Sequence, residues 1–326
     1  MQFTALWAGD LDRASLVQLC AAAIGVCYTS DHLPHYRPSQ GKPLDYGFAC
    51  LETLLSILPE VRQEAQLMKI ATFNINGIKA RLNALCDWLD EAQPDVALLQ
   101  EIKSVDEAFP RDAIEDRGYT VHTHGQKSFN GVAILSKLPL ENISRGLPGD
   151  ESDEQARWIE ATVMGEQAIH VCGLYLPNGN PTPGPKYDYK LAWMERLYTR
   201  AQNLIRDEIP AMMLGDYNII QKREDAATPD AWMTDALFRP ESRAAFQKIM
   251  ALGFTDALRA VDPHTRHFSF WDYQEGAWQR DDGILIDHIL MTPACADLLL
   301  DCQIDKHIRD REKPSDHVPV WVKLNA

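Results

Sequence analysis

Four short polar segments, spread over most of the chain, each adjoin an apolar run that is rich in β-forming residues. They are Phe73–Gly77, Leu99–Glu101, Gly215–Asn218 and Pro314–His317. Such a run predicts a β-strand, and the end of a strand is where a sheet can present polar side chains to a ligand. We therefore expect a sheet whose rim collects carboxylate, carboxamide and imidazole groups from distant parts of the sequence.

The residue types in these segments indicate a metal site. Carboxylate and carboxamide oxygens without a cysteine cluster suit Mg²⁺, or alternatively Mn²⁺, rather than zinc. Glu101 and Asp316 are predicted metal ligands because each follows an apolar strand or precedes one. A histidine next to such ligands favours the hydrolysis of phosphate esters.

The hydrolysis of a phosphodiester also needs a base for the attacking water and donors for the phosphate oxygens. Asp216, directly after Ala-Met-Met-Leu-Gly, is the best candidate to orient or deprotonate the water. Asn218 projects to the same side of an extended chain and could donate to a phosphate oxygen. A protonated His317 could stabilise the developing charge, and Asp287 could keep the imidazole charged and oriented.

Each of these residues also has a purely structural interpretation. Asp216 could be only a turn residue, because Gly, Asp and Asn favour turns. Asn74 could cap a turn, and His288 could be a hydrogen-bonded core histidine. Their joint occurrence favours a functional site, because chance turns do not supply a complete set of catalytic roles.

Composition limits the class of protein. The 326 residues are 45% hydrophobic and can bury a full-sized core, and no apolar run is long enough to cross a membrane. The seven cysteines show no C-x-x-C spacing, which favours free thiols in a reducing cytoplasm over disulfides or zinc. The net charge of −15 argues against a protein that coats nucleic acid, but a local basic rim could still serve an anionic substrate.

The motifs divide the chain into two parts. Residues 1–67 contain none of them and are treated as an N-terminal extension of uncertain structure, or as the result of a misassigned start of translation. Within it, 13–27 and 48–58 could be helices, and the Pro- and Gly-rich stretch 28–47 is expected to be a loop or linker. Residues 68–326 are predicted to form the catalytic domain.

Strands and helices are expected to alternate in this domain. Many strands with interspersed helices suit two packed sheets covered by helices, although a doubly wound parallel sheet fits the same pattern. The predicted strands are Lys69–Asn74, Val96–Gln100, Gly131–Leu135, Trp158–Val163, Ile169–Leu176, Ala211–Leu214, Ile284–Met291 and Val318–Leu324. The predicted helices are Arg81–Ala92, Tyr187–Glu208 and Pro240–Leu252.

Longer stretches around the motifs resemble the exonuclease III group of abasic-site endonucleases, within the endonuclease/exonuclease/phosphatase superfamily. The resemblance covers about residues 68–324 and leaves the first 67 unmatched. The matching stretches are Phe73–Arg81, Leu99–Lys103, Asn130–Leu135, Gly173–Asn178, Gly215–Asn218, Phe268–Tyr273, Ile286–Asp287 and Ser315–Pro319.

The resemblance implies a fold and an activity. The fold is an α/β four-layer αββα sandwich, in which two packed mixed sheets are flanked by helices. The activity is Mg²⁺-dependent cleavage of double-stranded DNA 5′ to an abasic site, together with removal of nucleotides or blocking groups from 3′ ends. We expect such an enzyme to act as a monomer in the cytoplasm.

The resemblance also assigns roles to individual residues. It implies that Asn74 orients Asp216, that Asp216 activates water, and that Tyr175 assists at the phosphate or the leaving group. Asp287 is expected to support His317. The residues expected at or close to the metal are Glu101, Asn74, Asp216, Asn218, Asp316 and His317. Asn76 departs from the acidic residue that some relatives carry at this position.

The expected contacts with DNA involve aromatic, amide and basic side chains. Phe270 and Trp271 are predicted to line an apolar pocket for a deoxyribose that lacks its base, although ordinary core would be the better interpretation of such a run in isolation. Asn178 stands where related enzymes can carry a longer side chain that inserts into DNA. Lys103 and Arg280 lie beside these motifs and are predicted to contact DNA.

Two other functions fit parts of the pattern. A non-DNA phosphoesterase of the phosphoinositide or lipid type would use nearly the same catalytic residues on the same scaffold, and only its recognition loops would differ. A catalytically inactive interaction module would lack at least one catalytic residue, whereas this chain has the complete set.

Overall fold

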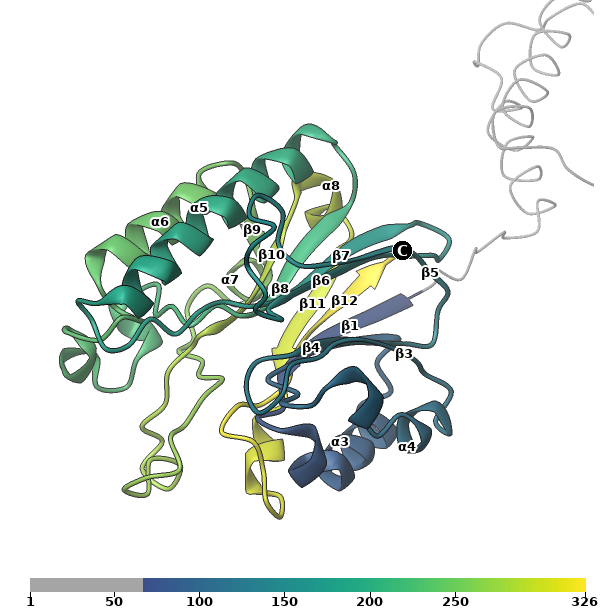
Figure 1. The fold of residues 1–326 in the computed structure, drawn as a ribbon, viewed down its shortest axis with the longest axis horizontal. Coiled ribbons are helices and arrows are strands. Elements are labelled where there is room, and N and C mark those ends of the chain that lie inside the picture. Colours follow the sequence, from purple (N-terminus) through teal and green to yellow (C-terminus); the bar gives the residue numbers. More distant parts are fainter. Residues whose placement is uncertain (1–66) are drawn as a thin grey trace, which may run out of the picture. The chain divides into compact units, whose positions relative to one another are not determined.

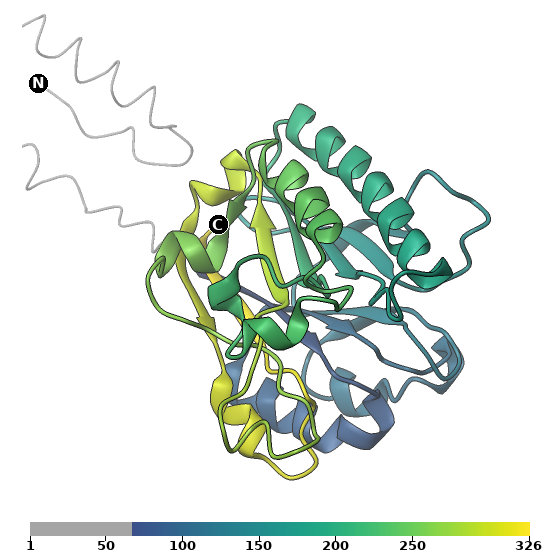
Figure 2. The ribbon, with the colours of Figure 1, turned by 90° about the vertical axis from the view of Figure 1, so that its left-hand side faces the viewer.

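The computed structural model describes residues 67–326, which form two six-stranded sheets with helices on their outer sides (Figures 1 and 2). All of these residues belong to one compact unit. The predicted helices at 13–27 and 48–58 and the predicted loop at 28–47 lie outside the described residues. Elements keep the labels of Figure 1.

The first sheet contains the strand that opens the described chain and the strand that closes it. Its strand order is β11-β12-β1-β2-β4-β3, in which β1 and β2 are parallel and the other pairs are antiparallel. In this order the strands are β11 (Leu299–Ile304), β12 (Val320–Asn325), β1 (Leu67–Asn74), β2 (Val96–Gln100), β4 (Val132–Ser136) and β3 (Thr120–His124).

The second sheet has the order β5-β6-β7-β8-β10-β9. Here β7 and β8 are parallel, and the other neighbours are antiparallel. In this order the strands are β5 (Leu140–Arg145), β6 (Trp158–Val163), β7 (Ile169–Tyr175), β8 (Ala211–Asp216), β10 (Asp287–Met291) and β9 (Thr255–Asp256). The sheets are mixed, so the doubly wound parallel arrangement is excluded.

The main hydrophobic core lies between the two sheets. Successive side chains of a strand point to opposite faces, and β1 shows the consequence. Met68 and Ile70 face the second sheet, where they pack with Val171 and Leu214, whereas Phe73 faces the helical side and packs on Trp88. Both faces of the central strands are therefore buried, which explains their nearly continuous apolar sequences.

Helices cover the outer face of each sheet, which gives the expected four layers (Figures 1 and 2). α3 (Ile78–Ala92) packs on the first sheet, and α5 (Pro185–Arg206) and α6 (Pro240–Met250) pack on the second. The shorter helices are α4 (Asp112–Glu115), α7 (Ala257–Val261) and α8 (Pro293–Ala296). Four 3₁₀ turns complete the described elements: η1 (Asp106–Ala108), η2 (Arg223–Asp225), η3 (Pro229–Trp232) and η4 (Lys306–Asp310).

The sequence analysis did not predict the strands β3, β5, β9 and β11. It also predicted a strand from Ile284 to Met291, whereas β10 covers only Asp287–Met291. β5 is mostly exposed and β3 carries polar residues on one face, so neither has a strong apolar pattern. β10 begins only at Asp287, because the preceding Ile284 forms isolated bridges with Ala226 and Phe270 and not a continuous ladder.

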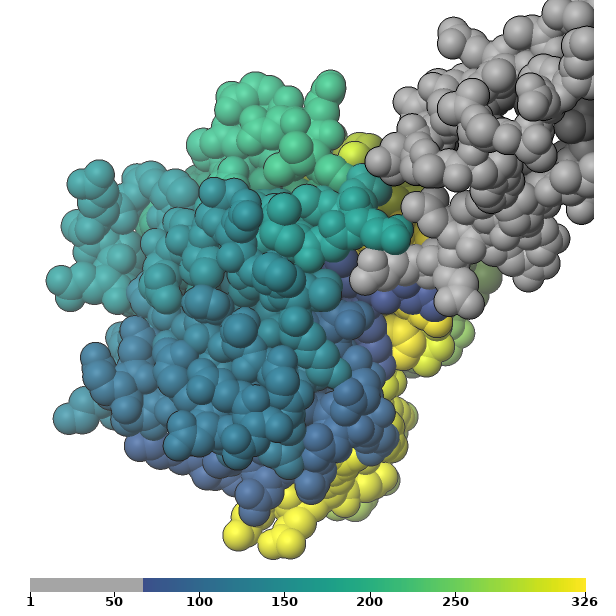
Figure 3. Space-filling view, turned by 90° about the vertical axis from the view of Figure 1, so that its right-hand side faces the viewer, coloured from purple at the N-terminus to yellow at the C-terminus, as the bar shows by residue number. Residues whose placement is uncertain are grey.

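β1 and β12 are antiparallel neighbours inside the first sheet, so the two ends of the described chain lie side by side. They pair from Leu67 opposite Asn325 to Thr72 opposite Val320, and Figure 3 shows the yellow C-terminal residues beside the dark blue residues of β1. β1 thus begins one residue before the predicted domain boundary.

Two further observations concern the cysteines and the helices of the described residues. Cys86, Cys172, Cys295 and Cys302 are buried free thiols. Among residues 67–326, no helix combines the length and the apolar character needed to cross a membrane.

Candidate active site

The predicted polar segments meet at one end of the two sheets. Asn74 is the last residue of β1, and Glu101 directly follows β2 in the first sheet. From the second sheet, Asp216 ends β8 and is paired across the ladder with Asp287, which opens β10. His317 lies shortly before β12. Sheet packing therefore gathers side chains that are far apart along the chain.

Asp216 lies at the centre of this site and is almost fully buried. Its Oδ2 accepts a hydrogen bond from Asn74 Nδ2 at 2.9 Å, and its Oδ1 accepts one from the backbone N–H of Asn218 at 2.8 Å. His317 Nε2 lies 3.6 Å from the same Oδ2. These contacts hold the carboxylate in one orientation, as a general base requires.

Gly215 allows β8 to approach β7 closely just before Asp216. Its φ is +154°, and a Cβ atom at this position would lie only 1.9 Å from the carbonyl oxygen of Leu174. Any side chain here would push the two strands apart. The glycine in the Gly215–Asn218 segment is thus needed to place Asp216.

His317 is held on its other side by a buried carboxylate. Its Nδ1 lies 2.8 Å from Asp287 Oδ2, which also accepts a hydrogen bond from Ser269 Oγ at 2.6 Å. Among the described residues, Asp287 Oδ1 has no hydrogen-bond partner. Both ring nitrogens of His317 therefore face carboxylate oxygens, an arrangement that favours the charged imidazolium.

The protonation states of the two central groups follow from burial and from each other. Burial raises the pKa of Asp216 to about 7; His317 opposes this shift, and Asp287 and Glu101 add to it. Burial lowers the pKa of His317, but Asp287 and Asp216 outweigh it and raise that pKa to about 10. His317 is thus charged at neutral pH, and Asp216 titrates where a general base is useful.

Glu101 lies where the two sheets meet. Its Oε1 accepts a hydrogen bond from Asn74 Nδ2 at 3.0 Å, and its Oε2 lies 2.8 Å from Lys103 Nζ. Burial alone would raise the pKa of Glu101, but Lys103 and Asn74 outweigh it and lower that pKa. Lys103 also donates to Asn76 Oδ1, and Asn76 Nδ2 donates to Asp316 Oδ1 at 2.9 Å. Lys103, a predicted DNA contact, is therefore directed at the acidic centre.

The donor set fits a hard divalent cation. The ligand atoms of Glu101, Asp216 and His317 lie within 4.8 Å of one another, and this group contains no thiol. Two carboxylates flanked by carboxamides match the oxygen ligands that Mg²⁺ and Mn²⁺ prefer. His317 is the least suitable of the three as a ligand, because both of its nitrogens already face carboxylates.

A second group with metal-ligand chemistry lies on β6 and β7. The ligand atoms of Glu160, His170 and Cys172 are equally close together. However, Arg200 Nε donates to Glu160 Oε2 at 3.0 Å, and its Nη2 lies 3.1 Å from His170 Nε2. A cationic side chain thus already neutralises this group, which is a structural network and not a metal site.

Two asparagines lie side by side next to Asp216. Asn178 Nδ2 donates to Asn218 Oδ1 at 3.1 Å, and Asn218 Nδ2 donates to the carbonyl oxygen of Leu176 at 3.0 Å. A carboxamide NH₂ has two N–H donors, so each asparagine keeps one for a further acceptor such as a phosphate oxygen.

Tyr175 ends β7 and remains a phenol. Burial raises its pKa well above the ordinary value, and the charges of Glu101 and Asp216 act in the same direction. The guanidinium of Arg157 lies 4.7 Å from the centre of its ring. Tyr175 is therefore available as a proton donor at neutral pH.

Phe270 links the active site to a neighbouring cavity. Its ring centre lies 5.0 Å from that of His317, and it lines a cavity of about 300 Å³ together with Ile284, Trp232 and Arg280. This cavity combines aromatic and aliphatic walls with a charged rim. It brings together the predicted residues Phe270 and Arg280 and adds two apolar residues that the sequence analysis did not select.

Trp271 does not belong to that cavity, which corrects the prediction that it lines an open pocket. Its side chain is fully buried and packs edge-on against Trp278, with ring centres 4.9 Å apart. Its indole N–H donates to Asp281 at 3.0 Å. Adjacent residues of the strand-like segment point to opposite sides, so Phe270 faces the site and Trp271 faces the core.

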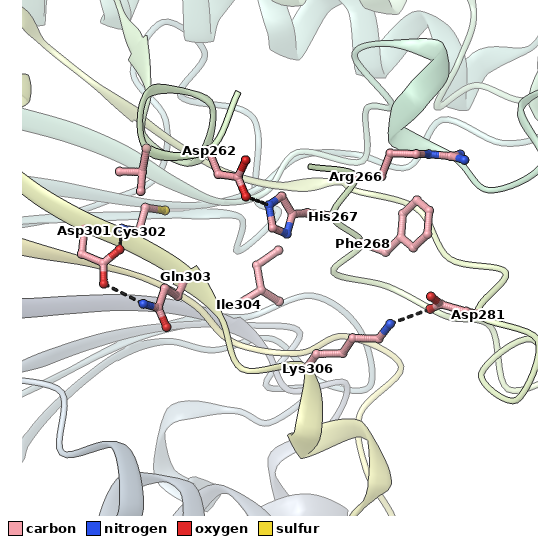
Figure 4. Close-up of a pocket in the computed structure, with 11 residues that line it drawn as sticks. Asp262, Arg266, His267, Phe268, Asp281, Asp301, Cys302, Gln303, Ile304 and Lys306 are labelled. Atoms are coloured by element: carbon pink, nitrogen blue, oxygen red, sulfur yellow. Dashed lines mark hydrogen bonds and ion pairs between the residues drawn. The ribbon is translucent and has the colours of Figure 1, made fainter. Parts of the chain in front are cut away.

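A further cavity of about 500 Å³ lies apart from the predicted site residues, between the loop after α7 and β11 (Figure 4). Four of its polar side chains form ion pairs with each other, since His267 lies 3.0 Å from Asp262 and Lys306 lies 2.8 Å from Asp281. None of the predicted site residues lines it.

Two buried polar residues of the site were not foreseen. Ser269 orients Asp287, and its position within Phe-Ser-Phe was the available signal. Lys190 of α5 donates to the carbonyl oxygens of Asn178 and Asn218. Its signal was a lysine on the apolar stripe of the helix, between the buried Tyr187 and Trp193.

Comparison with known proteins places this geometry in a family. Residues 71–317 match the model of the endonuclease/exonuclease/phosphatase family. The chain belongs to this family. Exodeoxyribonuclease III from Haemophilus influenzae is 37% identical over 269 residues, which cover 79% of this chain and 100% of that protein.

Solved structures of this family have the same fold. An AP endonuclease from Archaeoglobus fulgidus is 39% identical, with a TM-score of 0.76 over 79% of this chain and 100% of that one. A Neisseria 3′ phosphatase bound to a product DNA hairpin is 35% identical, with a TM-score of 0.75 over 79% of this chain and 99% of that one. The predicted αββα sandwich is thus confirmed.

Proposed function

We propose that this chain is a metal-dependent DNA repair nuclease of the exonuclease III type. It hydrolyses phosphodiester bonds 5′ to abasic sites and removes nucleotides or blocking groups from 3′ ends. The observation that carries the proposal is the buried carboxylate of Asp216, held by Asn74 and facing His317. The AP endonuclease, the exodeoxyribonuclease and the DNA-bound phosphatase among its relatives support DNA as the substrate.

In this proposal Asp216 takes the proton from the attacking water. Asn74 and the backbone N–H of Asn218 keep both of its oxygens in place, so the carboxylate is oriented before the reaction begins. Fixed donors cost little reorganisation when the reaction occurs, so their electrostatic effect on the transition state is large.

Charge on the phosphoryl oxygens is stabilised by the residues around Asp216. The charged His317, kept protonated by Asp287, and the free N–H groups of Asn178 and Asn218 are the donors. Tyr175 donates at the phosphate or the leaving oxygen.

Glu101 and Asp216 would hold the divalent cation, with Asp316 and Asn76 next to them. Bound there, Mg²⁺ or Mn²⁺ supplies positive charge that neutralises the phosphate. We assign Asn74 and Asn218 to orienting Asp216 and not to the metal. The side-chain N–H groups of Asn74 donate to the carboxylates of Glu101 and Asp216. The backbone N–H of Asn218 donates to Asp216, and its side-chain N–H donates to the carbonyl oxygen of Leu176.

DNA recognition is assigned to the cavity beside His317. A deoxyribose without its base could enter between Phe270 and Ile284, because unpairing costs least where no base is paired. Arg280 at the rim of this cavity and Asn178 at the phosphate complete the proposed contacts. We further propose that residues 68–326 form the catalytic domain, and that the enzyme acts as a cytoplasmic monomer on double-stranded DNA.

An assay of four substrates tests the proposal. Purified protein is incubated with an abasic-site duplex, a recessed 3′ end, an intact covalently closed duplex circle without any 3′ end and a phosphoinositide, each with Mg²⁺, with Mn²⁺ or with a chelator. We expect metal-dependent cleavage of the first two and little reaction with the others. A folded protein that cleaves neither DNA substrate with either metal, or that prefers the phosphoinositide, would refute it. The relatives described above give the lipid alternative no support.

A further inference from the structure

Lys190 is a lysine without any exposed surface, on the inner face of α5. Its Nζ donates to the carbonyl oxygen of Asn218 at 2.7 Å and to that of Asn178 at 3.1 Å. No carboxylate of residues 67–326 forms an ion pair with it. The side-chain nitrogen therefore donates to two backbone carbonyls, which belong to different loops.

These two loops carry the proposed phosphate donors. Asn178 lies in the connection from β7 to α5, and Asn218 lies just after β8. Their side chains are hydrogen bonded to each other at 3.1 Å, and the backbone N–H of Asn218 holds Asp216 at 2.8 Å. Lys190 thus binds the main chain of both asparagines whose side chains are hydrogen bonded to each other.

The backbone is shaped to admit the lysine. Gly179 adopts a φ of +91°, and a Cβ atom there would lie 2.7 Å from Lys190 Cδ. The absence of a side chain at residue 179 therefore leaves the space that the aliphatic stem of Lys190 fills. The turn that follows Asn178 and the helix that carries Lys190 fit each other.

Asn218 adopts a left-handed backbone conformation that this hydrogen bond supports. Its φ is +47°, in the left-handed region that a non-glycine residue adopts at a cost. The hydrogen bond from Lys190 to its carbonyl oxygen stabilises this conformation, and the conformation in turn directs the Asn218 N–H at Asp216.

From this geometry we infer that Lys190 is a positioning residue, which fixes Asn178 and Asn218 for the phosphate of the substrate through their backbone carbonyls. The inference rests on the proposed function for the role of the two asparagines. The geometric part, that Lys190 sets the conformation of both, holds whatever the substrate is.

Lys190→Met tests the inference, because methionine fills a similar volume but has no donor. We expect kcat on the abasic-site duplex to fall roughly 10- to 100-fold, the range seen when a group that orients a functional ligand is removed. KM for DNA should change much less, because the proposed contacts with Phe270 and Arg280 stay in place. Lys248→Met, the same change at a half-exposed lysine of α6, is the control and should retain the parental rate.

A double-mutant cycle separates positioning from a general structural role. If Lys190 acts through Asn218, Lys190→Met should cost little further activity when Asn218 is already alanine. If the two losses simply multiply, Lys190 does not act through Asn218 and the inference is wrong. Should Lys190→Met not fold, Lys190→Gln, whose shorter side chain ends in an uncharged NH₂ group, replaces it in the same cycle.

A measurement without substrate distinguishes this inference from the proposed function. In protein labelled with ¹⁵N-asparagine, the side-chain NH₂ signals of Asn178 and Asn218 can be assigned with Asn178→Ala and Asn218→Ala. We expect Lys190→Met to shift both signals and Lys248→Met to shift neither. Unchanged signals would overturn the inference even in an active nuclease, whereas shifted signals in a protein that cleaves no DNA would refute only the function.

Discussion

Asp216 combines three features at one position, namely burial, two hydrogen bonds to its oxygens and a charged imidazole nearby. Replacing it with asparagine keeps the shape but removes the base. We expect Asp216→Asn to lose roughly 100- to 10,000-fold in cleavage rate, the contribution of a general base. DNA binding, measured by fluorescence anisotropy, should be retained or strengthened because a negative charge near the phosphate is removed. A variant that cuts close to the parental rate would exclude Asp216 as the base.

Glu101 is the second residue whose charge should matter. Glu101→Gln keeps one oxygen ligand but lowers the negative charge of the site and leaves Lys103 without its carboxylate partner. More Mg²⁺ should therefore be needed for half-maximal activity, while the affinity for DNA changes little. The check is a metal titration of the cleavage rate, with Glu107→Gln on the exposed η1 as control. An unchanged titration would remove Glu101 from the metal site.

Replacing Phe270 should change substrate discrimination, whereas replacing its neighbour Trp271 should change the stability of the fold. Phe270→Ala opens the cavity next to His317, so it should reduce the ratio of cleavage rates on abasic and intact duplex. Trp271→Ala removes a fully buried indole and should lower stability by about 3–5 kcal/mol. Rate ratios and thermal melting of both variants test this. The assignment fails if Trp271→Ala melts like the parent, or if Phe270→Ala discriminates like the parent.

At the scale of elements, the segment Phe268–Trp271 joins the two sheets at the active site. Ser269 N donates to the carbonyl of Ile284 at 2.9 Å, and Val318 N donates to the carbonyl of Ser269 at 2.9 Å. The segment therefore lies between the residues that lead into β10 and those that lead into β12. This arrangement brings Asp287 and His317 within hydrogen-bonding distance, although they arise from different sheets.

The contact of α5 with β6 and β7 contains a buried ion pair that should make stability depend on pH. Burial alone would raise the pKa of Glu160, but His170 and Arg200 outweigh it and lower the pKa from 4.5 to about 2. A carboxylate whose pKa is lowered by folding stabilises the protein above the unfolded value and loses this effect as the pH falls. Its contribution of roughly 3 kcal/mol should therefore be complete above about pH 5 and disappear between about pH 4.5 and 2.

Glu160→Gln measures this contribution. Denaturant unfolding of parent and variant should differ by a few kcal/mol at pH 7, and the difference should shrink as the pH is lowered through 4.5. Glu166→Gln, at an exposed position in the same hairpin, serves as control and should match the parent at every pH. A difference that does not vary with pH would mean that Glu160 acts by packing alone.

At the scale of the whole molecule, every proposed functional residue lies between Asn74 and His317, and the described residues 67–326 form four hydrophobic clusters of their own. A chain that starts at Met68 should therefore fold and cleave an abasic site. Far-UV circular dichroism, melting and the cleavage assay, each beside the full chain, test this expectation. A soluble, folded but inactive product would show that residues 1–67 take part in the site or in DNA binding.

The sequence by itself determined the strands that carry the site and most of the residues at their ends. β2 and β6 have the predicted bounds, and the polar segments do lie where strands end. This information is local, since a continuous apolar run rich in β-formers marks a buried strand whatever surrounds it. The edge strands β3 and β5 were not predicted because they are partly exposed and carry no continuous apolar run.

Only the tertiary structure decided which side chains meet. Asn74 and Asp216 are 142 residues apart and share a hydrogen bond because two sheets pack face to face. The sequence could not show that Phe270 faces the site while Trp271 faces the core, because the direction of a side chain depends on which face of the segment is covered. Nor could it show which groups bind the side chain of Lys190. A buried amine is stable only where other groups accept its hydrogen bonds, and here the acceptors are carbonyl oxygens of two separate loops.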